Sequence, residues 1–117
     1  MSTVKIYHNP RCSKSRKTLE IIEKNGFKPD IIKYLDTPPS VDEITWVLSK
    51  LDMDPRELMR KNEVEYKQYF TDDSLSNEAL IVLMNKYPKV IERPIVISQD
   101  SVVIGRPPES VLDILVL

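Results

Sequence analysis

The hydrophobic residues of this sequence change their spacing along the chain, and each change marks a different element of secondary structure. Apolar and polar residues alternate over 3–8, which predicts a strand that Asn9-Pro10 ends. Helical spacing follows from about 13 to 25, and an apolar run over 29–34 predicts a second strand. The order strand, helix, strand indicates two parallel strands joined by a right-handed crossover.

The middle of the chain carries only helical patterns. Residues 40–43, Ser-Val-Asp-Glu, have the form of a capping box, and the apolar residues after them predict a helix to about position 51. A short helix is expected over 55–59, where Pro follows a cap residue, and a longer helix over 76–87. We therefore expect an all-helical insert over about 36–88.

Strand patterns return in the last quarter of the chain. Apolar runs at 95–97 and 102–104 flank the polar stretch 98–101, a pattern typical of a β-hairpin. A closing helix is expected after the Gly-Arg-Pro-Pro stretch at 105–108. Its inward side chains are expected to be Val111, Leu112 and Leu115.

The order of these elements predicts the fold. It is α/β and thioredoxin-like, β-α-β, helical insert, β-β-α, with a mixed four-stranded sheet. A chain of 117 residues has the usual length of one domain, so we expect a single thioredoxin-like domain over 1–117.

Composition narrows the partners and the location. Apolar residues make up 41% and charged residues 30%, and the net charge is −1, so attraction to nucleic acid or to an anionic membrane surface is not expected. No apolar run approaches the roughly 20 residues of a membrane span, and the N-terminus lacks the apolar stretch of a signal peptide. We expect a cytoplasmic protein, and a monomer because no interface pattern is visible.

Cysteine usage limits the redox chemistry. The sequence has one Cys and one His, so it can form neither an internal disulfide nor a Cys-based zinc site. Any second thiol must therefore come from another molecule. We expect neither a metal nor a bound organic cofactor.

Cys12 falls between the first strand and the first helix. The free N–H groups and the positive dipole end of a helix stabilise a thiolate, which is the reactive form of cysteine. Ser15 can donate a hydrogen bond to the sulfur, and His8 at the end of the strand is expected nearby. The alternative is a buried structural cysteine, which is common. Positive charge comes from Lys14, Arg16 and Lys17.

The spacing after Cys12 excludes one class of thiol enzyme. Phosphatase-type anion loops place an Arg six residues after the Cys, whereas position 18 here is Thr18. The four residues from Cys12 are instead a C-x-x-S sequence, the one-thiol form of a thioredoxin-type motif.

Longer motifs carry a family resemblance. Residues 8–16, His-Asn-Pro-Arg-Cys-Ser-Lys-Ser-Arg, resemble the nucleophile segment of ArsC-type arsenate reductases that depend on glutathione and glutaredoxin. Further blocks resemble the same family in the same order, at 34–39, 58–62, 92–96 and 104–107. Longer members continue past the last helix, so the resemblance implies that a C-terminal extension is missing from this sequence.

The resemblance implies a set of site residues. Cys12 matches the nucleophile that attacks arsenate, and glutathione is the co-substrate. The three arginines that hold the oxyanion correspond to Arg60, Arg93 and Arg106. The supporting residues correspond to His8, Asn9, Ser15 and Pro94, the last being the proline that is cis in thioredoxin-like folds.

Three functions follow from this resemblance and from the single thiol. The first is reduction of arsenate to arsenite with glutathione and glutaredoxin as electron donors. The second is a general glutathione-linked thiol oxidoreductase that acts on mixed disulfides. The third is an Spx-like regulator that binds RNA polymerase, although such regulators commonly carry a C-x-x-C switch and this chain has Ser15 at the second position.

Overall fold

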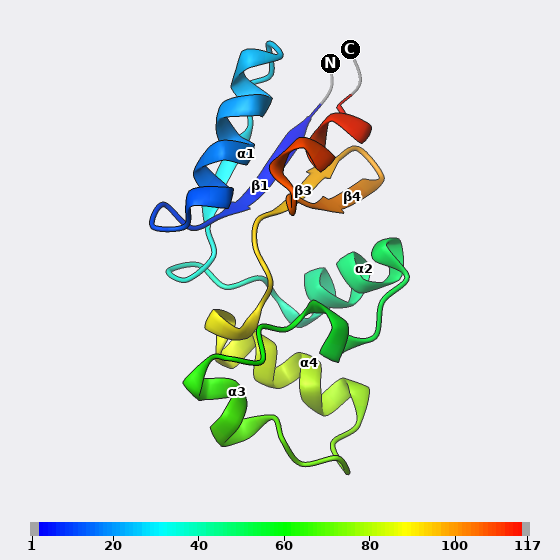
Figure 1. Ribbon diagram of the computed structural model, residues 1–117. Coiled ribbons are helices and arrows are strands. Elements are labelled where there is room, and N and C mark those ends of the chain that lie inside the picture. The colour runs from blue at the N-terminus through cyan, green and yellow to red at the C-terminus, as the bar shows by residue number, and fades with distance from the viewer. Residues whose placement is uncertain (1–2, 116–117) are drawn as a thin grey trace. The chain divides into compact units, whose positions relative to one another are not determined.

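The computed structural model describes residues 3–115 and divides the chain into two compact units. The first unit combines the residues up to Thr37 with those from Arg93 onward, and the second comprises 38–92 (Figure 1). Of the insert expected over about 36–88, residues 38–88 belong to the second unit, which extends to 92. The assignment of all 117 residues to one domain stays a prediction.

A mixed four-stranded sheet forms the centre of the first unit. Its strands are β1 (Val4–His8), β2 (Asp30–Lys33), β3 (Ile95–Ser98) and β4 (Ser101–Ile104), in the order β2-β1-β3-β4. β1 pairs with β2 in parallel and with β3 antiparallel, and β3 and β4 form the hairpin. This arrangement confirms the predicted α/β, thioredoxin-like fold class.

The core of the first unit lies between the sheet and two helical elements, α1 (Ser13–Lys24) and η3 (Pro108–Asp113). Gly26, with φ +86°, follows the end of α1 in the left-handed conformation that favours glycine. The side chains at the centre of this core are those of Val4, Ile6, Ile22, Val96 and Val111.

The closing helix differs from its prediction. Residues 108–113 form a 3₁₀ helix, and Leu112, expected to face inward, is 48% exposed. A 3₁₀ helix has three residues per turn, so Val111 and Ile114 share the inward side while Leu112 points away.

The secondary-structure elements of the second unit are all α-helices or 3₁₀ helices. They are α2 (Val41–Leu51), η1 (Pro55–Leu58), α3 (Val64–Tyr69), α4 (Asn77–Lys86) and η2 (Pro88–Val90). The capping box at the start of α2 is confirmed: the Ser40 hydroxyl accepts from the Glu43 N–H at 3.1 Å, and the Glu43 carboxylate accepts from the Ser40 N–H at 3.0 Å. α2 packs against α4.

The helix α3 was not predicted, because none of its six residues is buried and it shows no apolar stripe. Contacts made by aromatic rings hold it instead. Tyr66 stacks on Phe70 with centroids 5.7 Å apart, and Tyr69 stacks on Tyr87 at 4.3 Å.

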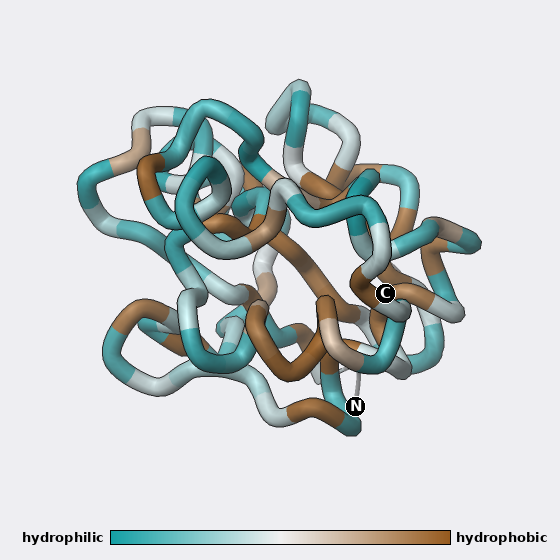
Figure 2. The backbone as a smooth tube through the Cα atoms, turned by 90° about the horizontal axis from the view of Figure 1, so that it is seen from below, coloured by the Kyte–Doolittle hydropathy of each residue, from teal (hydrophilic) through white to brown (hydrophobic). Residues whose placement is uncertain are grey.

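Hydropathy changes every few residues along the backbone, so short hydrophobic stretches are separated by hydrophilic ones (Figure 2). Among residues 3–115, no helix has the length and apolar character that crossing a membrane requires.

Candidate active site

Cys12 is the N-cap residue of α1. Its backbone is extended, with φ −95° and ψ 122°, and its carbonyl accepts the first helical hydrogen bond, from the Arg16 N–H at 3.0 Å. Its own N–H donates to the carbonyl of Asn9 at 3.0 Å, which closes the turn that leads out of β1. The sulfur therefore lies where the N–H groups of the first helical turn have no intrahelical partner.

Asn9 shapes this thiol loop with both its backbone and its side chain. It is buried, its side-chain oxygen accepts from the Arg11 N–H at 3.0 Å, and its own N–H donates to the Ser15 hydroxyl at 3.0 Å. Arg16 adds a further bond, from Nη1 to the carbonyl of Pro10 at 2.9 Å. Hydrogen bonds thus join Asn9 and Pro10, which precede the thiol, to residues of the first helical turn after it.

His8 and Ser15 form a buried pair behind the thiol loop. The Ser15 hydroxyl forms a hydrogen bond with Nδ1 of His8 at 2.6 Å, and it also accepts the Asn9 N–H. Burial, followed by the charges of Lys33 and Arg16, lowers the pKa of His8, which agrees with a neutral ring.

The structure shows which group of Ser15 meets the sulfur of Cys12. The sequence predicts that Ser15 can donate a hydrogen bond to the sulfur, and the group that does so is its backbone N–H. Its hydroxyl is engaged by His8 and Asn9. His8 accordingly acts on the thiol loop through Ser15.

The surroundings of Cys12 favour the thiolate. Partial burial opposes ionisation, but the N–H of Ser15, the side chain of Arg93 and the N–H of Lys14 all bond to the sulfur, and together they lower the pKa of Cys12. The side chain is neither fully buried nor fully exposed. A half-exposed sulfur with a lowered pKa differs from the buried structural cysteine considered above, whose pKa burial would raise.

Two arginine-bearing turns of the first unit reach the sulfur. Arg93 bonds to it from the residue before Pro94, where the Arg93–Pro94 peptide bond is cis. Arg106 follows β4 and donates from Nη2 to the sulfur at 3.7 Å, while its Nε donates to the carbonyl of Arg93 at 2.8 Å. The structure therefore brings Cys12, Arg93 and Arg106 together from three separate stretches of sequence.

Arg60 lies in the second unit. Its N–H donates to the carbonyl of Val90, and its guanidinium is flanked by two carboxylates, with Glu92 3.4 Å from Nη1 and Glu63 3.7 Å from Nε. Only about a quarter of each of these three side chains is exposed. The role of Arg60 in holding an oxyanion stays a prediction.

Two other basic residues of α1, Lys17 and Arg16, contact neighbouring residues. Lys17 pairs with Glu20 at 3.8 Å on the exposed face of the helix. Arg16, as described above, bonds to the thiol loop. No acidic residue occupies the first turn of α1, so no carboxylate there offsets the partial positive charge of the helix N-terminus.

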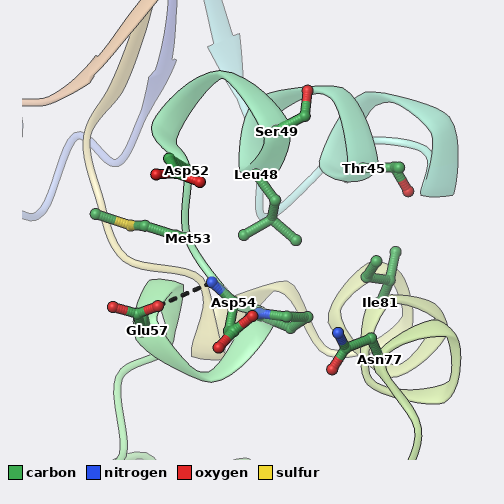
Figure 3. A pocket seen from close by; sticks show the side chains of 10 residues that line it. Thr45, Leu48, Ser49, Asp52, Met53, Asp54, Glu57, Asn77 and Ile81 are labelled. Carbon is green, nitrogen blue, oxygen red and sulfur yellow. Dashed lines mark hydrogen bonds between the residues drawn. The ribbon is translucent and has the colours of Figure 1, made fainter.

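A cavity of about 430 Å³ opens in the second unit, lined by residues of α2, η1 and α4 (Figure 3). Leu48 and Ile81 point into it, and Asp52 and Glu57 lie at its side. None of the site residues predicted from sequence lines it.

Comparison with known proteins gives a consistent result. The model of the ArsC family matches residues 7–114. An Escherichia coli protein named arsenate reductase is 42% identical over 98% of this chain and 82% of its own length. YfgD, an uncharacterised protein of Escherichia coli K12, is 51% identical over 95% of both chains. A solved arsenate reductase from Vibrio cholerae is 48% identical, with a TM-score of 0.92 over 97% of this chain and 98% of that one.

Proposed function

The chain belongs to the ArsC family, and on that premise we propose that it reduces arsenate to arsenite by nucleophilic attack of the Cys12 thiolate. The observation that carries the proposal is the setting of this sulfur. The pKa of the Cys12 thiol is lowered, the side chain is partly accessible, and two guanidinium groups bond to the sulfur. These are the properties that attack on a small oxyanion requires.

The first step joins two anions. Arsenate carries between one and two negative charges near neutral pH, and the thiolate carries another, so the two repel each other. Arg93 and Arg106 supply permanent positive charge beside the sulfur and planar donors that suit an oxyanion. We propose that Arg60 is the third arginine. The sulfur then forms a bond to arsenic, and one arsenate hydroxyl takes up a proton from solvent and leaves as water.

The second stage reduces arsenic by two electrons. Cys12 is the single cysteine of the chain, so both electrons must come from thiols of other molecules. Glutathione bonds to the arsenic of the adduct, and a second oxygen leaves as water. A glutaredoxin thiolate then attacks the glutathione sulfur, so the electron pair of the S–As bond stays on arsenic and a glutathione–glutaredoxin mixed disulfide leaves. Water hydrolyses the remaining bond between Cys12 and arsenic(III) and releases arsenite. In sum, one arsenate and two thiols give one arsenite, one disulfide and one water, and Cys12 returns as a thiolate. The arginines stabilise the negative charge on the oxygens throughout.

The direct experiment measures arsenite formed from arsenate in the presence of glutathione and a glutaredoxin. Turnover should need both donors and should be lost in Cys12→Ser, whereas Ser13→Ala, a change at the exposed neighbouring residue, should retain it. Omission of each donor in turn tests the order of the two thiols.

Other outcomes would select another function. Turnover retained by Cys12→Ser would contradict the mechanism. Release of glutathione from a mixed disulfide without arsenate turnover would select the general thiol oxidoreductase, and capture of RNA polymerase without turnover would select the regulator.

The setting of the reaction follows from its reagents. Glutathione keeps thiols reduced in the cytosol, so we propose a cytoplasmic location. We also propose that the protein works as a monomer, because the thiol, Arg93 and Arg106 all come from one chain.

A further inference from the structure

Gly105 lies where two turns meet a helix. It follows β4 directly, it is buried, and its N–H donates to the carbonyl of Pro94 at 2.9 Å. The residue after it is Arg106, whose guanidinium donates to the sulfur of Cys12. One backbone hydrogen bond at Gly105 therefore joins the turn that carries Arg106 to the turn that carries Arg93.

Thr18 of α1 fills the other side of this glycine. Its side chain is fully buried, and its hydroxyl donates to the carbonyl of Lys14 at 2.7 Å and lies 3.5 Å from the carbonyl oxygen of Gly105. A β-branched side chain in a helix has few rotamers, and the bond to Lys14 holds this one. Thr18 lies about one and two-thirds helical turns after Cys12, the N-cap residue of the same helix.

A methyl group at position 105 has no room. A Cβ there would lie 2.5 Å from Oγ1 and 3.0 Å from Cγ2 of Thr18, and 2.8 Å from Cγ of Pro94. These separations are well below the roughly 3.5–4.0 Å of ordinary carbon contacts. Because Thr18 is held in α1 and Pro94 is a ring, the turns rather than the side chains would have to move.

We propose that Gly105 is a positioning residue: its missing side chain lets the turns that carry Arg93 and Arg106 lie against α1, with their guanidinium groups beside Cys12. The reactive sulfur and its two arginines belong to segments that meet at this contact. The N–H groups of Lys14 and Ser15, which also face the sulfur, move with the helix and are unaffected. The significance of this placement for catalysis rests on the proposed function, but the placement itself can be measured without arsenate.

The variant Gly105→Ala should move both turns away from the thiol. We expect the inflection in the pH profile of Cys12 alkylation to move to higher pH, and the alkylation rate at pH 6.5 to fall about threefold to tenfold. The ratio kcat/KM for arsenate should fall at least as much.

Gly26→Ala is the matched control, because it makes the same chemical change at the only other glycine of the chain. A Cβ at Gly26 meets nothing within 4 Å, but its φ of +86° strains any other residue. This variant should therefore lose thermal stability and keep the parental alkylation profile. The proposal would be overturned if the alkylation profile shifted in both variants in proportion to their loss of thermal stability.

Rescue provides the second test. Thr18→Ala removes both Thr18 atoms that crowd position 105 but leaves Cγ of Pro94, so the double variant Thr18→Ala/Gly105→Ala should regain part of the alkylation rate lost in Gly105→Ala. If Gly105→Ala does not fold, the double variant should fold and alkylate at a rate below that of Thr18→Ala. A folded Gly105→Ala with the parental profile would overturn the proposal, and so would a double variant no better than Gly105→Ala.

The two proposals fail in different ways. A parental protein that alkylates at low pH but never reduces arsenate removes the proposed function and leaves the role of Gly105 intact. If the parental protein reduces arsenate but Gly105→Ala has an unchanged alkylation profile, the proposed function stands and the role of Gly105 is removed.

Discussion

Arg106 donates from Nη2 to the sulfur of Cys12 at 3.7 Å, although 94 residues separate the two in the sequence. The contact exists because β4 pairs with β3, β3 pairs with β1, and β1 leads into the loop that ends at Cys12. The pairing of the strands thus places the Arg106 guanidinium, a permanent positive charge, at the start of α1, where helix N–H groups already favour an anion.

The two arginines should each support the thiolate. Arg93→Ala and Arg106→Ala should each slow Cys12 alkylation at pH 6.5 by about threefold to tenfold, because each removes a charge-assisted bond from a partly exposed sulfur. Lys17→Ala removes an exposed charge of the same helix and should leave the rate within about twofold of the parent. Equal rates in all three variants would exclude a special role for the two guanidinium groups.

His8 should make stability depend on pH. Because the pKa of His8 is lowered in the folded state, the unfolded chain binds more protons below about pH 6.5. Its contribution to the free energy of unfolding is therefore complete above about pH 6.5 and is lost as the pH falls toward the folded pKa.

His8→Asn keeps a hydrogen-bond acceptor near Ser15 but cannot titrate in this range. Urea unfolding between pH 7.5 and 5 should give a flatter dependence in the variant, by up to about 1.4 kcal/mol per pH unit. Parallel curves for parent and variant would show that the imidazole is not held neutral.

Arg56 should hold the second unit together. Its guanidinium donates to the Tyr66 hydroxyl at 3.1 Å and to the carbonyls of Phe70 at 2.6 Å and Asp72 at 3.0 Å. Arg56→Lys keeps the charge but loses the planar fork, so it should cost about 1–3 kcal/mol in the free energy of unfolding. Lys61→Ala, at an exposed position, should cost less than about 0.5 kcal/mol. An Arg56→Lys variant as stable as the parent would contradict this structural role.

Much of the fold could be predicted from local patterns. Alternation identified the first strand, and short apolar runs identified the other three. The Ser40–Glu43 pair identified the start of α2, and the Asn9-Pro10 break placed Cys12 at a helix start. These features depend on residues close together in sequence. The helix α3 was missed because its stability comes from stacked rings and from Arg56, with no buried stripe of its own.

The site was less accessible to sequence reasoning. Ser15 was recognised as important, but the choice between its hydroxyl and its N–H depends on His8 and Asn9, which compete for the hydroxyl. The contact between Thr18 and Gly105 left no local signal, because it spans 87 residues and consists of space too small for a methyl group. The arginines were identified by family resemblance, since nothing in their spacing distinguishes them from surface arginines.

The pH dependence of Cys12 alkylation tests the central claim most directly, because this is the only sulfhydryl group in the chain and every count of alkylated protein reports on it. We predict rapid modification of the native protein, with an inflection clearly below the ordinary cysteine pKa of about 8.5. An inflection at or above that value, or a native thiol that reacts only after unfolding, would contradict a nucleophile held ionised by amides and guanidinium groups.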